Sequence, residues 1–312
     1  MKLKLKENKM FIIIFIIFLF VAFYSGNEYR TFIKQNVDGH KLDLEHCESG
    51  YFEEHYPEAD VNSLCEELKN YHPEIELKKD AFFITFDILS HYTISYLQVF
   101  APLLIILAAL YTFQKKLKSG FFKNIMTRME YKKFMIKSVL KSYSASLFIP
   151  ITIIVIFILS YILSGSLDFN HTVATTDPSA IPDALLNNYR KMPQFIITFL
   201  LTFILHGMFW INIGYIVAKK SKNIVITVVG SFIVYIVIFA ISDIVIGAYL
   251  LEKILHIKGG LYLVNFGNIW LYIDIYNLWI PIIYGLILFI ISLIILIKIY
   301  KNKEEVIVAS EK

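Results

Sequence analysis

Long apolar runs alternate with polar or charged segments along this chain of 312 residues. Six runs stand out, at residues 10–26, 92–113, 143–163, 193–218, 224–249 and 278–300. Each is close to the roughly 20 apolar residues that a helix needs to cross a bilayer. In hydrocarbon every backbone polar group must be bonded within the protein, so we expect each run to be a helix. A membrane β-barrel would need alternating polarity over about 10 residues, whereas runs such as ILFIISLIILIKIY are continuous.

Composition strengthens this interpretation. Hydrophobic residues make up 57% of the chain and charged residues 18%, whereas soluble domains contain about 45–50% and about 25%. We therefore predict an all-α integral membrane protein with six transmembrane helices. A soluble α/β enzyme does not fit this composition.

The signs of the charges between the runs predict an orientation. Residues 27–90 hold six Lys/Arg against fifteen Asp/Glu, whereas residues 115–141 hold nine Lys/Arg and one acid. Residues 219–223 add three lysines. Short basic loops stay in the cytoplasm, so we expect both termini there and the acidic segment outside. The predicted units are a cytosolic tip with the first span (1–26), an extracellular domain (27–90), a five-span bundle (91–300) with a cytosolic loop (114–142), and a cytosolic tail (301–312).

The first run has an alternative interpretation as a secretory signal peptide, because lysines precede its apolar residues. The sequence VAFYSG offers no small-x-small cleavage site, since Phe23 and Tyr24 stand where small residues belong. We therefore expect a retained helix. Cleavage would leave the rest of the topology unchanged.

The acidic segment holds the two cysteines of the chain, Cys47 and Cys65. A disulfide between them would stabilise the segment by about 3 kcal/mol in the chain-entropy estimate. Two free thiols, or a metal site that also uses His46, His55 and His72, are the alternatives. The Cys-x17-Cys spacing matches no zinc template, so we favour the disulfide and predict no metal.

The segment before the last run is half apolar and contains a Gly259-Gly260 break. Its aromatic residues Trp270, Tyr272, Tyr276 and Trp279 are typical of a membrane interface. We expect an interfacial or re-entrant segment here, with an ordinary loop as the alternative.

Catalytic motifs are missing from the sequence. It contains no G-x-x-x-x-G-K-[ST], no H-E-x-x-H and no G-x-S-x-G. We therefore predict no enzyme activity, no bound cofactor and no nucleic-acid partner for this chain. Polar residues within the runs are the remaining candidates, because burying them in a membrane is costly. These are Gln98, His206 and Asp243. A neutral His206 that only bonds a neighbouring helix is the plainer alternative.

The basic loop also has an amphipathic pattern. At about 100° per residue, the apolar side chains of residues 121–129 fall within about 140° of one another. Ser119-Gly120 supplies a turn before them. The charges alone would hold the loop in the cytoplasm. Beyond that, the helix could lie on the anionic inner leaflet, or it could bind a cytosolic partner.

From about residue 114 to residue 140 the sequence resembles the first cytoplasmic loop of ABC-2-type permeases, the membrane subunits of ABC exporters, and most of all those of low-GC Gram-positive bacteria. The shared pattern is a glycine, a short amphipathic helix, a basic cluster and a lysine that opens the next span. Here these are Gly120, residues 121–129, Tyr131-Lys132-Lys133 and Lys137. The layout of six spans with a long first outside loop is similar as well.

This resemblance implies that residues 119–133 form a coupling helix for a separate ATPase subunit, which would supply ATP and Mg²⁺. The implied docking residues are Gly120, Phe121, Phe122, Ile125, Arg128, Met129, Lys132 and Lys133. It also implies a second permease, as a homo- or heterodimer, in a bacterial plasma membrane. The exported substrate would be amphipathic: a peptide, bacteriocin, lipid or drug. The rival hypothesis is a membrane-anchored immunity or sensor protein whose acidic domain binds a cationic peptide without ATP.

Overall fold

The computed structural model describes residues 9–56, 60–78, 80–93, 96–118, 130–167, 192–221, 223–257, 260, 264 and 279–302. This part of the chain is helical and contains no strand. Its helices are α2 (Lys9–Ser49), α3 (Tyr51–His55), α4 (Val61–Asn70), α5 (Pro73–Glu76), α6 (Ala81–Asp87), η1 (Ile88–Thr93), η2 (Tyr96–Phe100), α7 (Ala101–Lys118), α9 (Tyr131–Ser142), η3 (Tyr143–Leu147), α10 (Phe148–Ser164), α13 (Met192–Ala218), α14 (Ile224–Ile241), η4 (Ser242–Ile254) and α16 (Trp279–Ile299).

Five helical stretches in the described residues are long and apolar enough to cross a membrane. They are Lys9–Ser49, Tyr131–Ser164, Leu200–Ala218, Ile224–Ile254 and Trp279–Ile299. The expected span at 92–113 is not among them. It comprises the end of η1, the π-helical segment η2 and most of α7, and residues 94 and 95 lie outside the described part. The all-helical, membrane-like character is confirmed, whereas the count of six spans is not.

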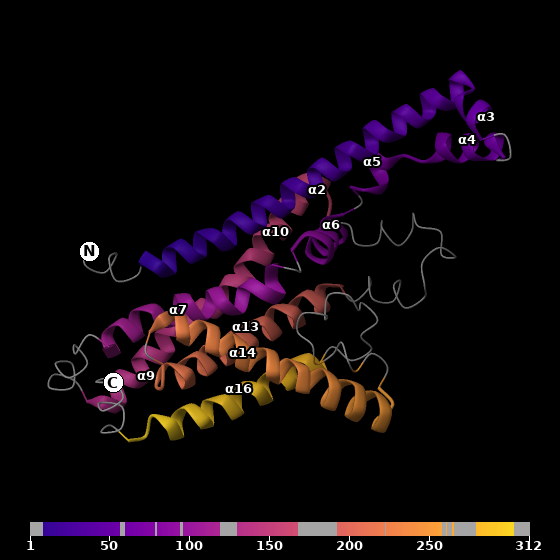
Figure 1. Cartoon of the computed structure of the whole chain (residues 1–312). Coiled ribbons are helices and arrows are strands. Elements are labelled where there is room, and N and C mark those ends of the chain that lie inside the picture. Colours follow the sequence, from indigo (N-terminus) through magenta and orange to yellow (C-terminus); the bar gives the residue numbers. More distant parts are fainter. Residues whose placement is uncertain are drawn as a thin grey trace.

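Helix α2 does not end at Gly26, where its apolar run ends. It continues without a break to Ser49, as the long ribbon in Figure 1 shows. A helix of this length extends about 60 Å, about twice the thickness of the hydrocarbon core. The stretch contains no proline, and the helix stops where Gly50 adopts a left-handed φ of 73°. The expected boundary between the first span and the acidic segment is therefore not a helix end.

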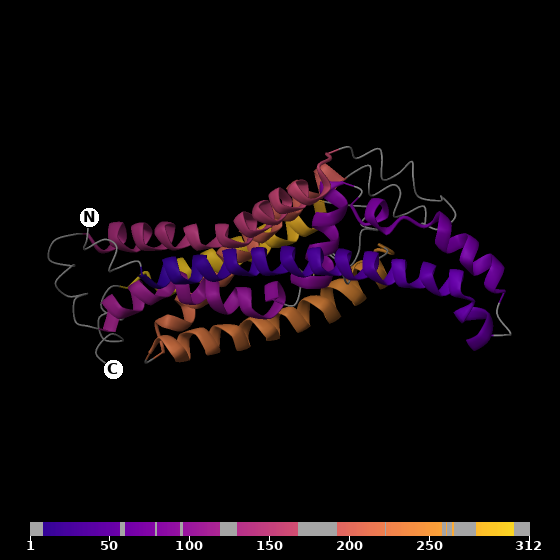
Figure 2. The ribbon, with the colours of Figure 1, turned by 90° about the horizontal axis from the view of Figure 1, so that it is seen from above.

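The outer half of α2 and the short helices α3, α4 and α5 form a projection that we name the arm (residues 34–56 and 60–78). In Figures 1 and 2 it extends away from the remaining helices. No residue of α3 or α4 is buried. The arm is the counterpart of the predicted extracellular domain, but its described residues form a helical hairpin without a core of their own.

The inner half of α2 packs against α10. The ring of Phe148 lies 4.7 Å from that of Phe11 and 5.5 Å from those of Phe15 and Phe18. Close to the end of the apolar run, Gly26 lies against Leu159. These contacts make α2 part of the helix bundle.

Helix α13 lies at the centre of the bundle, where it contacts α7, α10, η3, α14 and α16. Its Trp210 and Tyr215 are fully buried. Gly207 permits a close approach of two backbones, because a Cβ atom there would lie 2.9 Å from the Cα of Ser146. Small residues let helices approach closely in membranes, where packing replaces the hydrophobic driving force.

Large apolar side chains cover the outer faces of the bundle. Ile16 on α2, Ile162 on α10, Ile244 on η4 and Trp279 on α16 are each more than half exposed. A soluble protein rarely exposes an apolar surface of this extent. Acyl chains would cover these faces in a bilayer.

One end of the bundle is rich in lysine, and we name it the basic end. The start of α2, the end of α7, the start of α9, the turn between α13 and α14 and the end of α16 all lie there (Figure 1). Hydrogen bonds confirm the proximity, since Tyr131 reaches the Tyr300 carbonyl and Lys219 reaches the Ile299 carbonyl. The arm projects from the opposite end.

Candidate functional site

His206 lies in the middle of the bundle and is only 4% exposed. Its Nδ1 donates a hydrogen bond to the Thr202 carbonyl at 3.0 Å, which leaves Nε2 as an acceptor in the neutral ring. The ring is held on one side by α16, where a Cβ atom on Gly285 would lie 3.2 Å from it. This bond goes to its own helix, and not to a neighbouring helix as in the plainer interpretation, and the ring also faces a cavity.

This cavity, of about 20 Å³, is lined by His206, Tyr235, Ser242, Val264 and Tyr284, among others. The hydroxyls of Ser242 and Tyr284 are hydrogen-bonded to each other. A space of this size holds about one water molecule. The cavity therefore combines an imidazole and three hydroxyl groups from α13, α14, η4 and α16.

Asp243 adjoins the same cluster. It follows Ser242 at the start of η4, and its carboxylate is close enough to the hydroxyls of Tyr235 and Tyr284 to interact with them electrostatically. The structure thus brings together two residues that the sequence singled out separately, His206 and Asp243. Gln98 falls in η2, and its side chain lies outside the described part.

Val264 reaches the cavity from the segment predicted to be interfacial or re-entrant. It is 4% exposed, and Gly260 in the same segment lies against η4, since a Cβ atom there would be 3.0 Å from the Gly247 carbonyl oxygen. These two described residues fold back on the bundle. Residues 251–257 of the segment are also described, as the end of η4 and the three residues after it, whereas the remainder, including the aromatic residues before Trp279, lies outside the described residues.

A second polar cluster links α7 with α14 at the basic end. Gln114 donates from Nε2 to Ser221 Oγ at 3.0 Å, and its Oε1 accepts from the Thr227 hydroxyl at 2.6 Å. The hydroxyls of Ser221 and Thr227 also bond each other. All three side chains are buried. Their mutual hydrogen bonds offset the cost of placing them in an apolar interior.

A chain of hydroxyl groups joins α7 to three more helices at this end. Tyr131 of α9 donates to the Tyr300 carbonyl at 2.8 Å, and Tyr300 donates to the Tyr215 carbonyl of α13 at 2.8 Å. Ser142 lies 2.8 Å from the Tyr215 hydroxyl and donates to the Ala109 carbonyl of α7 at 3.0 Å. No sequence pattern predicts these linked hydroxyl groups, because tyrosine and serine are ordinary residues in apolar runs.

Of the predicted docking residues, only Lys132 and Lys133 belong to the described part of the chain. Gly120, Phe121, Phe122, Ile125, Arg128 and Met129 lie outside the described residues. Lys132 and Lys133 are exposed in the first turn of α9. They therefore belong to the helix that continues into α10, and Glu130 separates them from the predicted amphipathic helix.

The two cysteines meet at the tip of the arm. Cys47 of α2 and Cys65 of α4 form a disulfide with a Cα–Cα distance of 5.8 Å. This is the favoured one of the three sequence-based alternatives. Nearby, the rings of His46 and His55 stack on Tyr51 at 4.3 and 3.9 Å. Among the described residues no group of three His, Cys, Asp or Glu side chains could hold a metal ion.

The fold defines the class of this chain as a helical membrane protein with several apolar helices long enough to span a bilayer. No family model matches the sequence, and no curated protein or solved structure has significant similarity to it. A function therefore has to be argued from the residues themselves.

Proposed function

We propose that this chain is the permease subunit of a bacterial ABC exporter. In this proposal six spans cross the plasma membrane, with η2 and α7 forming the second, and both termini are cytoplasmic. The basic end then faces the cytoplasm, where lysine-rich segments remain during insertion. The arm then faces outward. The proposal begins from the resemblance of residues 114–140 to the coupling loop of ABC-2-type permeases.

The observation that carries the proposal is the way in which α7 and α9 are joined on either side of residues 119–129. Ser142 links the end of α9 to the Ala109 carbonyl of α7, and Tyr215 extends this link to the central helix α13. Tyr131 connects the start of α9 to the end of α16. A displacement of the loop would therefore reach four helices through hydrogen bonds.

Such a connection suits a docking element that transmits force. ATP binding would close a pair of ATPase subunits, and the loops of two permeases would carry that closure into their bundles. Phe121, Phe122, Ile125 and Met129 would fill a groove of the ATPase, since aromatic anchors dominate such interfaces. Arg128, Lys132 and Lys133 would pair with acidic residues at its rim.

Co-purification with an ATPase tests this function. Phe122→Asp places a charge on the apolar face of the predicted helix and should abolish capture of an ATPase from the native membrane, with membrane insertion intact. Asn124→Asp adds the same charge on the polar face and should leave capture unchanged. Failure of the wild-type chain to capture any ATPase, with none encoded beside it, would refute the exporter.

A second candidate function is a membrane-anchored immunity or sensor protein. The observation in its favour is the arm, because a continuous helix displays an acidic, disulfide-closed hairpin far from the bundle. A cationic amphipathic peptide would be attracted by this charge. Peptide binding by the full chain in nanodiscs, together with no ATPase capture, would support this function over the exporter.

A further inference from the structure

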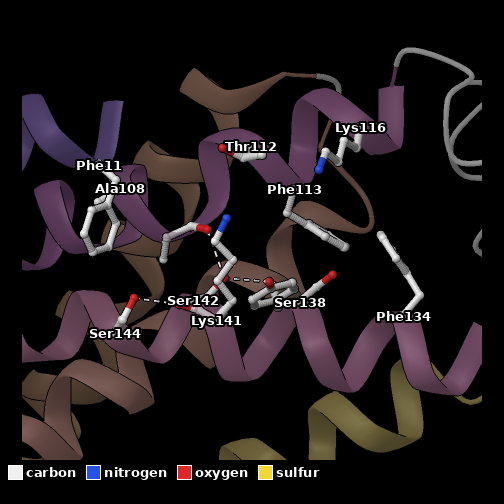
Figure 3. A pocket seen from close by; sticks show the side chains of 12 residues that line it. Phe11, Ala108, Thr112, Phe113, Lys116, Phe134, Ser138, Lys141, Ser142 and Ser144 are labelled. Atoms are coloured by element: carbon white, nitrogen blue, oxygen red, sulfur yellow. Dashed lines mark hydrogen bonds between the residues drawn. The ribbon is translucent and has the colours of Figure 1, made fainter. Parts of the chain in front are cut away.

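A cavity of about 200 Å³ opens between α7 and α9 at the basic end. It is separate from the His206 cavity, and three of its lining residues, Ala109, Ser142 and Tyr215, also belong to the hydroxyl chain. Figure 3 shows Lys116 reaching into it from α7 and Lys141 from α9, on opposite sides. The half-buried Lys116 and the exposed Lys141 therefore place two cationic side chains along the lining of one open cavity.

The remaining walls of the cavity are amphipathic. Phe113, Phe134 and Tyr215 are buried and form an apolar floor, to which Phe11 of α2 contributes an edge. Hydroxyl groups of Thr112 and Ser138 lie in the lining as well. A ligand that fits this chemistry carries negative charge on one part and hydrocarbon on another.

The surface beside the cavity indicates what kind of amphiphile this is. Phe11 stands at the start of α2, and the residues that follow it, Ile12, Ile13, Ile16 and Ile17, are all exposed. They belong to an apolar helix long enough to span a bilayer, so acyl chains would contact them. The cavity volume far exceeds the roughly 30 Å³ share of one water molecule and suits a small headgroup.

We propose that this cavity binds the headgroup of an anionic phospholipid. The phosphate would lie between Lys116 and Lys141, and the acyl chains would follow the exposed face of α2. Basic pockets between transmembrane helices recognise anionic lipid headgroups in this way. The bound lipid would connect α2, α7 and α9, which the direct hydrogen bonds described above join only in part.

Lipid selectivity of the full chain tests the site. The protein is placed in nanodiscs of phosphatidylcholine, with and without phosphatidylglycerol, and retained lipid is measured by native mass spectrometry. The wild type should retain phosphatidylglycerol selectively. The double variant Lys116→Gln/Lys141→Gln should lose about 25-fold in preference, about fivefold for each ammonium group. Lys116→Arg/Lys141→Arg should keep most of it.

The matched control removes two exposed lysines from the same end, Lys137 and Lys301, by substitution with Gln. It should retain the lipid as the wild type does. An equal loss in this control would show general surface attraction and overturn the site. Unchanged selectivity in the Lys116/Lys141 variant would also overturn it, provided that the variant is monodisperse in phosphatidylcholine. Inorganic phosphate should not displace the lipid at millimolar concentration. If it does, the site binds free phosphate and the lipid proposal fails.

Discussion

The arm and the basic end of the bundle are both helical, yet they are held together in different ways. At the basic end, side chains of α7, α9, α13, α14 and α16 bond one another or the backbone of a neighbouring helix. In the arm, α3 and α4 bury no residue, and a disulfide ties α4 to α2. The basic end is thus held together by packing and hydrogen bonds, whereas the arm is held by a covalent cross-link.

Burial explains this difference. A hydroxyl or amide in an apolar interior must find a partner, so the bundle specifies its helix positions through polar contacts. The arm is exposed to water, where such contacts add little, and a cross-link restricts the unfolded chain instead. Changes in the two regions should therefore have effects that do not spread from one to the other.

Removal of the disulfide should have the largest local effect. Cys47→Ser/Cys65→Ser opens a loop with a sequence separation of 18 residues, which should destabilise the hairpin by about 3 kcal/mol. Hydrogen exchange and tryptic cleavage should increase in α3 and α4, while the thermal unfolding midpoint of the bundle in detergent stays the same. Unchanged exchange in the hairpin would show that its helices need no cross-link. A lowered bundle midpoint would mean that the two regions are coupled.

A pair of glycine substitutions compares the two regions again, this time with the destabilising change in the bundle and its control in the arm. Gly207→Ala places a methyl group 2.7 Å from Ser146 Cβ and 2.9 Å from its Cα, where the backbone has to move. The overpacking should cost the bundle about 2 kcal/mol. Gly39→Ala in α2 meets no atom within 4 Å and should stabilise the helix slightly, by about 0.5–1 kcal/mol. Thermal unfolding of both variants in detergent checks this, and equal effects would contradict the assigned packing.

The sequence predicted the spans better than the arm. Helix α16, at Trp279–Ile299, nearly coincides with the apolar run at 278–300, and α14 begins at Ile224 as expected. The predicted boundary at Gly26 was wrong as a helix end, because a change from apolar to polar residues marks the edge of the lipid and not the end of a helix. Without proline, α2 simply continues.

The candidate site was predictable only in part, because ionisable groups in an apolar run carry a sequence signal and hydroxyl groups do not. The cost of burying ionisable groups singled out His206 and Asp243, and the structure places both beside Tyr284. Ser242 and Tyr284 carried no such signal, since their hydroxyls are common in apolar runs. The contacts of the basic end join residues as far apart as Tyr131 and Tyr300, which no local pattern can reveal.

A hydroxyl deletion should give a smaller effect than the glycine substitution. Thr227→Val keeps the shape of the side chain but removes the donor to Gln114 Oε1, in a site where Gln114, Ser221 and Thr227 are all buried. The expected loss is about 1 kcal/mol of bundle stability. Thr31→Val removes a hydroxyl that bonds the Asn27 carbonyl at an exposed position and should be neutral. If the two variants unfold at the same temperature in detergent, burial does not govern these bonds.

The smallest effect is expected at the junction of the arm with the bundle, where α6 carries Asp87. Burial raises the pKa of the Asp87 carboxyl above its usual range, and the nearby His91, with Nδ1 2.9 Å from Asp87 Oδ1, partly opposes the shift. A raised pKa means that the folded state holds the proton more tightly than the unfolded state. Stability from this group should therefore increase as the pH falls through the raised pKa towards the ordinary value near 4.

Asp87→Asn should remove this dependence and leave the protein slightly more stable at neutral pH, because no charge is then buried. Thermal unfolding in detergent between pH 4 and pH 8 measures it, with the exposed Glu45→Gln in the arm as the control that should keep the wild-type profile. A steeper loss of stability towards acid in the wild type than in Asp87→Asn would mean that the bond to His91 outweighs burial. The junction would then be held by an ion pair.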